Sequence, residues 1–125
     1  MRAYLLVFVG GGFGAMVRHG VNVAFGRWFG TSFPFHTLFE NVSGSLLMGL
    51  LAGYFAFKSD ASQALRLFLT TGVLGGYTTF SAFSLDTALL WERHQHARAL
   101  VYVGVSVIAS LAGLALGLVL MRRLP

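Results

Sequence analysis

The residue types best suited to ion chemistry lie together in residues 75–84, whose sequence is GGYTTFSAFS. Paired glycines permit irregular backbone, and unwound carbonyl groups of a broken membrane helix can coordinate a cation. In an apolar segment such groups are tolerated only where protein buries them or they line a wet cavity. The stretch therefore predicts an ion site at a helix break. The alternative is a π-bulge or glycine kink that serves packing alone.

Two phenylalanines directly follow this predicted break. Phe80 and Phe83 stand three residues apart on one helical face, and Thr79 lies close beside Phe83 at four-residue spacing. The edges of aromatic rings carry partial positive charge, so two rings presented edge-on would favour a small anion. Phenylalanines in membrane helices commonly do no more than pack or face lipid. Their position after a polar break favours the anion-binding interpretation.

Two stripes of polar side chains run along other apolar segments. Asn41 and Ser45 are one helical turn apart, and Tyr102, Ser106 and Ser110 repeat at the same spacing. Two such stripes indicate a polar path. A single serine in a membrane helix often bonds back to a carbonyl of its own helix. The prediction therefore depends most on Asn41, for which a functional role or an interhelical hydrogen bond is favoured.

Ionisable residues inside apolar segments are functional candidates by default because burying them is costly. The candidates are Arg18, Glu40 and Asp86, although Arg18 near the end of its segment could instead extend its charge to the membrane surface. His94 and His96 lie in a polar connection and are expected to be solvated. The chain has no cysteine, which excludes disulfides and thiol chemistry. A metal-dependent enzyme is not expected.

The composition is that of an integral membrane protein. Of 125 residues, 56% are hydrophobic and 10% are charged, against about 25% charged in soluble domains. The nine Lys and Arg residues are scattered among apolar segments, so the net charge of +5 does not indicate nucleic-acid binding. We expect a single all-α domain with four transmembrane helices at about residues 3–25, 35–57, 64–91 and 99–121.

The elements that must position these residues follow from segment lengths. A straight helix over residues 64–91 would be about 42 Å long, against about 30 Å for the hydrocarbon core, and a break in residues 75–79 resolves the excess. The first segment has no convincing cleavage site, so a removable signal peptide is not expected. Residues 26–34 are predicted to form the first loop. Glycine and alanine repeats at four-residue spacing in three segments predict close helix packing.

Lys and Arg are almost evenly divided between the two sides of the predicted bundle, five on the side of the termini and four on the other. A strong bias would fix the orientation in the membrane. Its near absence allows insertion in both orientations, so two copies could meet as an antiparallel homodimer. The alternative is a weakly biased monomer with one orientation.

These motifs resemble those of the Fluc fluoride-channel family, also called CrcB. The resemblance covers nearly the whole chain and includes GGFGAMVRH at residues 11–19, TLFENVSGSLLMG at residues 37–49 and TTGVLGGYTTFSAFS at residues 70–84. It implies a dual-topology antiparallel homodimer in the bacterial inner membrane. It also implies two pores that export fluoride passively and protect the cell from fluoride, together with a structural sodium ion at the dimer centre.

The resemblance also implies a role for each matching residue. Phe80 and Phe83 would turn ring edges to fluoride, and Asn41 would donate from its amide. The remaining pore residues would be the polar side chains Thr79, Tyr102, Ser106 and Ser110. Sodium would bind the backbone carbonyls of Gly75 and Thr78, and Arg18 would draw anions toward a vestibule.

Three residues depart from the family pattern: His36, Glu40 and Asp86. Glu40 matters most, because a carboxylate beside Asn41 would repel an anion if it faced the pore. Neighbouring helix residues point about 100° apart, so Glu40 is expected to face a vestibule or a helix partner instead. Two alternatives remain. One is a proton-coupled exporter of fluoride or small ions that uses Glu40 or Asp86, and the other is a membrane scaffold that transports nothing.

Overall fold

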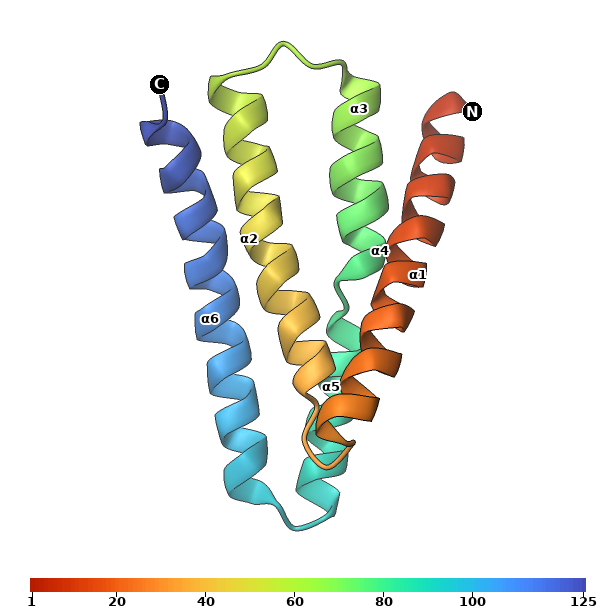
Figure 1. Cartoon of the computed structure of the whole chain (residues 1–125), viewed down its shortest axis with the longest axis vertical. Coiled ribbons are helices and arrows are strands. Elements are labelled where there is room, and N and C mark those ends of the chain that lie inside the picture. The colour runs from red at the N-terminus through yellow and green to blue at the C-terminus, as the bar shows by residue number, and fades with distance from the viewer.

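The computed structural model describes all 125 residues, and the fold is all-helical, as predicted (Figure 1). The elements, in chain order, are α1 (Arg2–Phe29), α2 (Phe35–Phe57), α3 (Gln63–Leu67), the π-helix η1 (Phe68–Leu74), α4 (Gly75–Tyr77), α5 (Phe80–Glu92) and α6 (His96–Arg123). The four elements from α3 to α5 follow one another along a single path, the third span. Both termini lie at the same end of the bundle.

The side chains are distributed as in a membrane protein. Helices α1 and α6, of 28 residues each, are long and apolar enough to cross a membrane. Only 18 of the 125 residues are buried, and many large hydrophobic side chains face outward. The buried set includes four polar or charged residues: Thr37, Glu40, Thr79 and Ser106. An apolar exterior around a partly polar interior suits lipid as the surrounding solvent.

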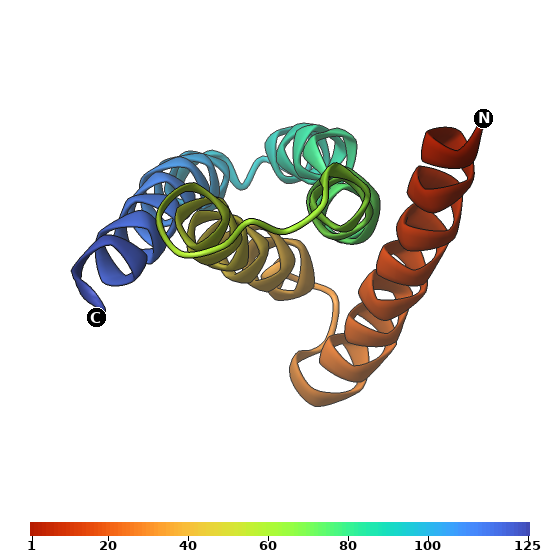
Figure 2. The ribbon, with the colours of Figure 1, turned by 90° about the horizontal axis from the view of Figure 1, so that it is seen from above.

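The helices pack in a simple order. Seen from above, α2 lies between α6 and the third span, and α1 covers the outer side of the third span (Figure 2). Several helix contacts are close enough to require glycine. A Cβ atom on Gly117 of α6 would lie 2.6 Å from the Leu46 carbonyl oxygen of α2, and one on Gly10 of α1 would lie 2.8 Å from the Phe68 carbonyl oxygen. The predicted small-residue repeats therefore lie at helix contacts.

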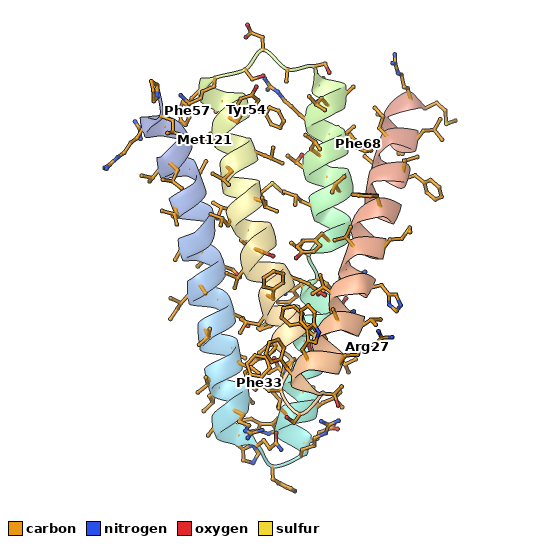
Figure 3. All side chains as sticks on the ribbon, in the orientation of Figure 1. Arg27, Phe33, Tyr54, Phe57, Phe68 and Met121 are labelled. Carbon is orange, nitrogen blue, oxygen red and sulfur yellow. The ribbon has the colours of Figure 1, made fainter.

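The end of α1 corrects one prediction. Residues 26–29, expected in the first loop, belong to the helix, which ends at Gly30 with a φ of 73°. A positive φ suits glycine and is a common way to end a helix. Arg27, which the loop prediction had included, lies on the last turn (Figure 3). Because α1 continues to Phe29, Arg18 lies well inside the helix and not near its end.

The third span departs from α-helical geometry at two places. Its first departure is the π-helix η1, and the second is the extended backbone of Thr78 (φ −84°, ψ 156°) and Thr79 (φ −153°, ψ 118°). Gly75 and Gly76 lie between them and are helical. The expectation that the glycine pair itself has irregular backbone is therefore wrong. Gly76 is needed for packing, because a Cβ atom there would lie 2.9 Å from the Gly11 carbonyl carbon of α1.

Candidate functional site

The extended segment between α4 and α5 is held by hydrogen bonds from side chains as well as backbone. The Thr78 N–H and the Thr78 hydroxyl both donate to the Leu74 carbonyl at 3.0 Å. The Thr79 hydroxyl accepts a hydrogen bond from the Ala82 N–H at 3.1 Å and so caps the start of α5. The segment is therefore an ordered interruption of the span.

Asn41 of α2 supplies the remaining partner of this segment. The Thr79 N–H donates to Asn41 Oδ1 at 2.8 Å, and Asn41 Nδ2 donates to the Thr79 carbonyl at 3.0 Å. In a continuous helix the Thr79 N–H would instead bond to the carbonyl of Gly75. The side chain that the sequence singled out as a donor in the pore is thus also bound to the backbone of the break.

A groove of about 440 Å³ lies beside the break, between α2, α5 and α6. Its lining includes six of the seven predicted pore residues: Asn41, Thr79, Phe80, Phe83, Ser106 and Ser110. Ser45 and Thr78 also line it. Residues from three helices that are far apart in sequence are therefore brought to one surface.

The two phenylalanines differ in their surroundings. The Phe80 and Phe83 ring centroids are 5.4 Å apart with the rings tilted by 46°. The Phe80 side chain is 79% exposed, whereas Phe83 is half-buried and lies 5.3 Å from the Tyr102 ring. The groove is therefore open on the outer face of the single chain, on the side where Phe80 lies.

The Ser106 hydroxyl makes no hydrogen bond to any other group of the protein. Its Oγ atom is buried and has no hydrogen-bond partner, and the residue is 5% exposed. Because a buried hydroxyl without a partner is costly, this atom is available to a ligand in the groove. It is the one groove-lining side-chain oxygen or nitrogen that is both buried and unpaired.

Tyr102 lies outside the groove, behind Phe83. It is fully buried, and its hydroxyl donates to Asp86 Oδ2 at 3.1 Å. The Phe33 ring packs edge-on against it at 5.7 Å, and Figure 3 shows Phe33 near the lower end of the bundle. A second, smaller cavity of about 80 Å³ lies at this end and is lined by Asp86, His36 and Arg93, among others. Asp86 therefore contacts both Tyr102 and this cavity.

The other ionisable candidates lie away from the groove. Glu40 is 1% exposed, is not part of the groove lining, and has a buried Oε1 atom without a hydrogen-bond partner. It faces the interior of the bundle, so the concern that it borders the anion path does not apply to this groove. Arg18 is half-buried on α1 and does not line the groove either.

Two features of the site were missed by the sequence analysis. One is the partner of Asn41: an interhelical hydrogen bond was among the expectations for this residue, but not its reciprocal pairing with the Thr79 backbone. The other is the close contact between α2 and the break at Gly44. A Cβ atom on Gly44 would clash with the Thr78 side chain and would lie 3.3 Å from the Tyr77 ring. Gly44 had stood outside the predicted glycine repeats.

Residues 5–118 match the protein family described as "CrcB-like protein, Camphor Resistance (CrcB)". Similar proteins include one from Rhodopseudomonas palustris (strain BisB5), with 64% identity over 97% of this chain and 98% of the relative. A protein from Nitrobacter hamburgensis is 62% identical over 97% and 98%, and one from Methylobacterium nodulans is 54% identical over 95% of each chain. The first and third relatives are named "Fluoride-specific ion channel FluC", and the second carries the same name with the number 2.

Proposed function

Because this chain belongs to the CrcB-like protein family, we propose that it is a fluoride-selective ion channel. Fluoride enters cells as neutral HF, which ionises inside, and the channel lets the ion leave down its electrochemical gradient. Passive flow of this kind protects the cell and needs no turnover chemistry, so the protein is not an enzyme. The full-length match to relatives named for this activity supports the assignment.

The groove beside the break is the observation that carries the proposal. Fluoride is small and strongly hydrated, so a pore must replace its water with close hydrogen-bond donors. The groove is lined by the unpaired Ser106 hydroxyl, the Asn41 amide, the Ser110 hydroxyl and the Phe83 ring. Hydrogen-bond donors together with aromatic rings that present their edges would suit a small anion.

Tyr102 and Arg18 are assigned to the two approaches of the path. Tyr102 lies between the groove and the smaller cavity lined by Asp86 and His36. It would extend the polar track of α6 beyond Ser106 toward that end of the bundle. Arg18, an arginine inside α1, would attract anions to a vestibule by its charge.

A second copy of the chain would complete the site. The groove is open where the Phe80 ring is 79% exposed, and the nearly balanced Lys and Arg counts favour insertion in both orientations. We therefore infer a multi-pass protein of the inner membrane that forms a dual-topology antiparallel homodimer. A C-terminal reporter should then appear on both sides of the membrane, and a single orientation would contradict the antiparallel arrangement.

The sodium ion expected at the dimer centre fits the backbone of the break. The Thr79 N–H, which would pair with the Gly75 carbonyl in a continuous helix, is bound to Asn41 instead. Gly75 is exposed on the single chain, so its carbonyl and that of Thr78 would be available to an ion shared between two copies. Hard oxygen ligands suit a hard cation, and the bound ion would supply positive charge that joins the two chains.

A proton-coupled exporter is the second candidate, and one observation favours it. Glu40 has a buried carboxyl oxygen without a partner inside the bundle, and such a group can carry a proton. Asp86, which accepts a hydrogen bond from Tyr102 beside the smaller cavity, is the other candidate proton carrier. In this mechanism fluoride movement would depend on a proton gradient.

Purified protein in fluoride-loaded liposomes distinguishes the two mechanisms. A potassium ionophore sets the membrane voltage, and a fluoride electrode follows the efflux. The channel predicts efflux driven by voltage without a pH gradient, and no efflux from protein-free liposomes or of chloride. Absence of efflux would refute fluoride transport, and a requirement for a pH gradient would establish the exporter instead.

A further inference from the structure

The Asn41 side chain and the Thr79 backbone form a closed pair of hydrogen bonds between residues 38 positions apart. Their lengths, 2.8 and 3.0 Å, are those of ordinary hydrogen bonds. The pair fixes the orientation of the carboxamide. A flipped amide would bring its NH₂ group to the Thr79 N–H and its oxygen to the Thr79 carbonyl, and both bonds would be lost.

The break needs this partner. Thr79 is 7% exposed, so water has little access to its backbone. An N–H or C=O group without a partner inside a membrane protein is costly, because it loses its bond to water and gains none in return. Asn41 satisfies one donor and one acceptor with a single side chain. It therefore stabilises the extended conformation at the point where the helix is interrupted.

The pairing also determines which polar atoms of Asn41 remain free to interact with an ion in the groove. Asn41 lines the groove, and its Oδ1 atom and one of its two Nδ2 hydrogens are engaged by Thr79. The polar hydrogen that remains is the second hydrogen of Nδ2. An unconstrained carboxamide can turn either its oxygen to a cation or its NH₂ group to an anion. Here the Thr79 N–H already occupies the oxygen, and the free hydrogen of Nδ2 is the donor left for an ion.

We propose that the break and Asn41 act as one unit, in which the Thr79 backbone orients the Asn41 carboxamide as a fixed hydrogen-bond donor to the anion. Asn41 is then a positioning residue for the break as well as a ligand, and the break contributes to discrimination between anions and cations. The inference deepens the proposed function and rests on it only for the identity of the anion.

Backbone hydrogen exchange tests the structural half of this proposal. Full-length protein labelled with ¹⁵N-threonine is compared with the variants Asn41→Ala and Asn41→Asp. Losing the acceptor in Asn41→Ala should speed exchange of the Thr79 amide by about tenfold or more. A carboxyl group in Asn41→Asp still accepts the bond, so Thr79 should stay protected. The Thr78 amide, bonded to Leu74, is the internal reference. Equal protection of Thr79 in all three proteins would overturn the proposal.

Fluoride flux in liposomes tests the functional half, with Ser43→Ala as the matched control. Ser43 lies on the same helix and bonds to Tyr77 Oη at 2.9 Å but not to the break backbone, so this variant should keep both flux and Thr79 protection. Asn41→Ala and Asn41→Asp should both lose flux. The Asp side chain offers no donor to the groove, because it is either ionised or has its one proton bonded to the Thr79 carbonyl. Wild-type flux in Asn41→Asp would refute the donor role.

One measurement on the wild-type protein keeps the proposal testable if the variants do not fold. The two Nδ2 hydrogens of Asn41 should give separate proton resonances, and sodium fluoride should shift the free one more than the one bonded to Thr79, with sodium chloride as the control. Equal shifts, or none, would overturn the proposal. Absence of fluoride flux in the wild-type protein would refute the proposed function instead, while the Thr79 exchange result would stand on its own.

Discussion

In η1 the backbone of the third span keeps its own hydrogen bonds in a wider turn, as where the Gly75 N–H bonds to the Thr70 carbonyl five residues earlier. At Thr78 and Thr79, which the three residues of α4 separate from η1, the backbone is extended, and the N–H and carbonyl of Thr79 bond to the Asn41 side chain of another helix. The π-helix η1 packs against α1 through close contacts that only glycines allow. The extended segment is instead held by hydrogen bonds from specific polar groups.

This difference separates two kinds of substitution. Side chains added to the glycines beside η1 and α4 should prevent the helices from packing, whatever their polarity. Changes around the extended segment should leave the bundle folded and alter the ion path. The four predictions below test that separation, in order of decreasing effect.

The largest effect is expected from Gly76→Ala. The added Cβ atom would lie 2.9 Å from the Gly11 carbonyl carbon, and backbone cannot move away as a flexible side chain can. Overpacking of this kind costs about 3 kcal/mol, so the melting temperature and the yield of folded protein on a sizing column should fall sharply. Gly12→Ala is the control, because a Cβ atom there meets nothing within 4 Å. Equal melting temperatures for the two variants would show that the contact tolerates a side chain.

Phe80→Ile and Phe83→Ile should abolish fluoride flux without unfolding the protein. Both changes remove an aromatic ring edge at the groove but keep an apolar side chain of moderate size. Efflux from liposomes should fall to the level of protein-free controls, while the elution volume on a sizing column stays that of the wild type. Undiminished flux in both variants would remove the aromatic rings from the mechanism.

Ser106→Ala should lower flux by about tenfold, because a hydrogen bond to an anion contributes about 1.5 kcal/mol. Stability should not fall, since the Ser106 hydroxyl has no protein partner to lose. Gly104→Ala, on the same helix and in open space, is the matched control and should conduct as the wild type does. The hydroxyl has no role as a ligand if the two variants conduct equally.

The smallest effect is expected from Glu40→Gln. Glu40 does not line the groove, and glutamine keeps its shape while removing the group that would carry a proton. Flux driven by voltage should be unchanged at neutral pH. Flux that is lost in this variant, or that depends on a pH gradient only in the wild type, would favour the exporter mechanism over the channel.

Sequence reasoning identified many of the residues that line the groove, because they are chemically unusual residues in an apolar chain. Asn41, Thr79, Phe80, Phe83, Ser106 and Ser110 were all identified from residue type and spacing, and the groove brings them together. Tyr102 was placed in the same track but lies behind Phe83. The orientation of Glu40 could not be predicted in detail, because it depends on which neighbours surround α2.

The sequence by itself determined the class of the protein, through its apolar composition, and the approximate place of the break, through segment length and polar residues. It also indicated several of the places where helices approach closely, because glycine allows backbones to come so near. Tertiary structure decided the exact residues of the break. Gly76 is committed to α1 by its contact with Gly11, so the chain extends at Thr79, where Asn41 from a distant helix can satisfy the backbone. The residues of the break could not be predicted from local sequence, since Asn41 and Thr79 become neighbours only in the folded bundle.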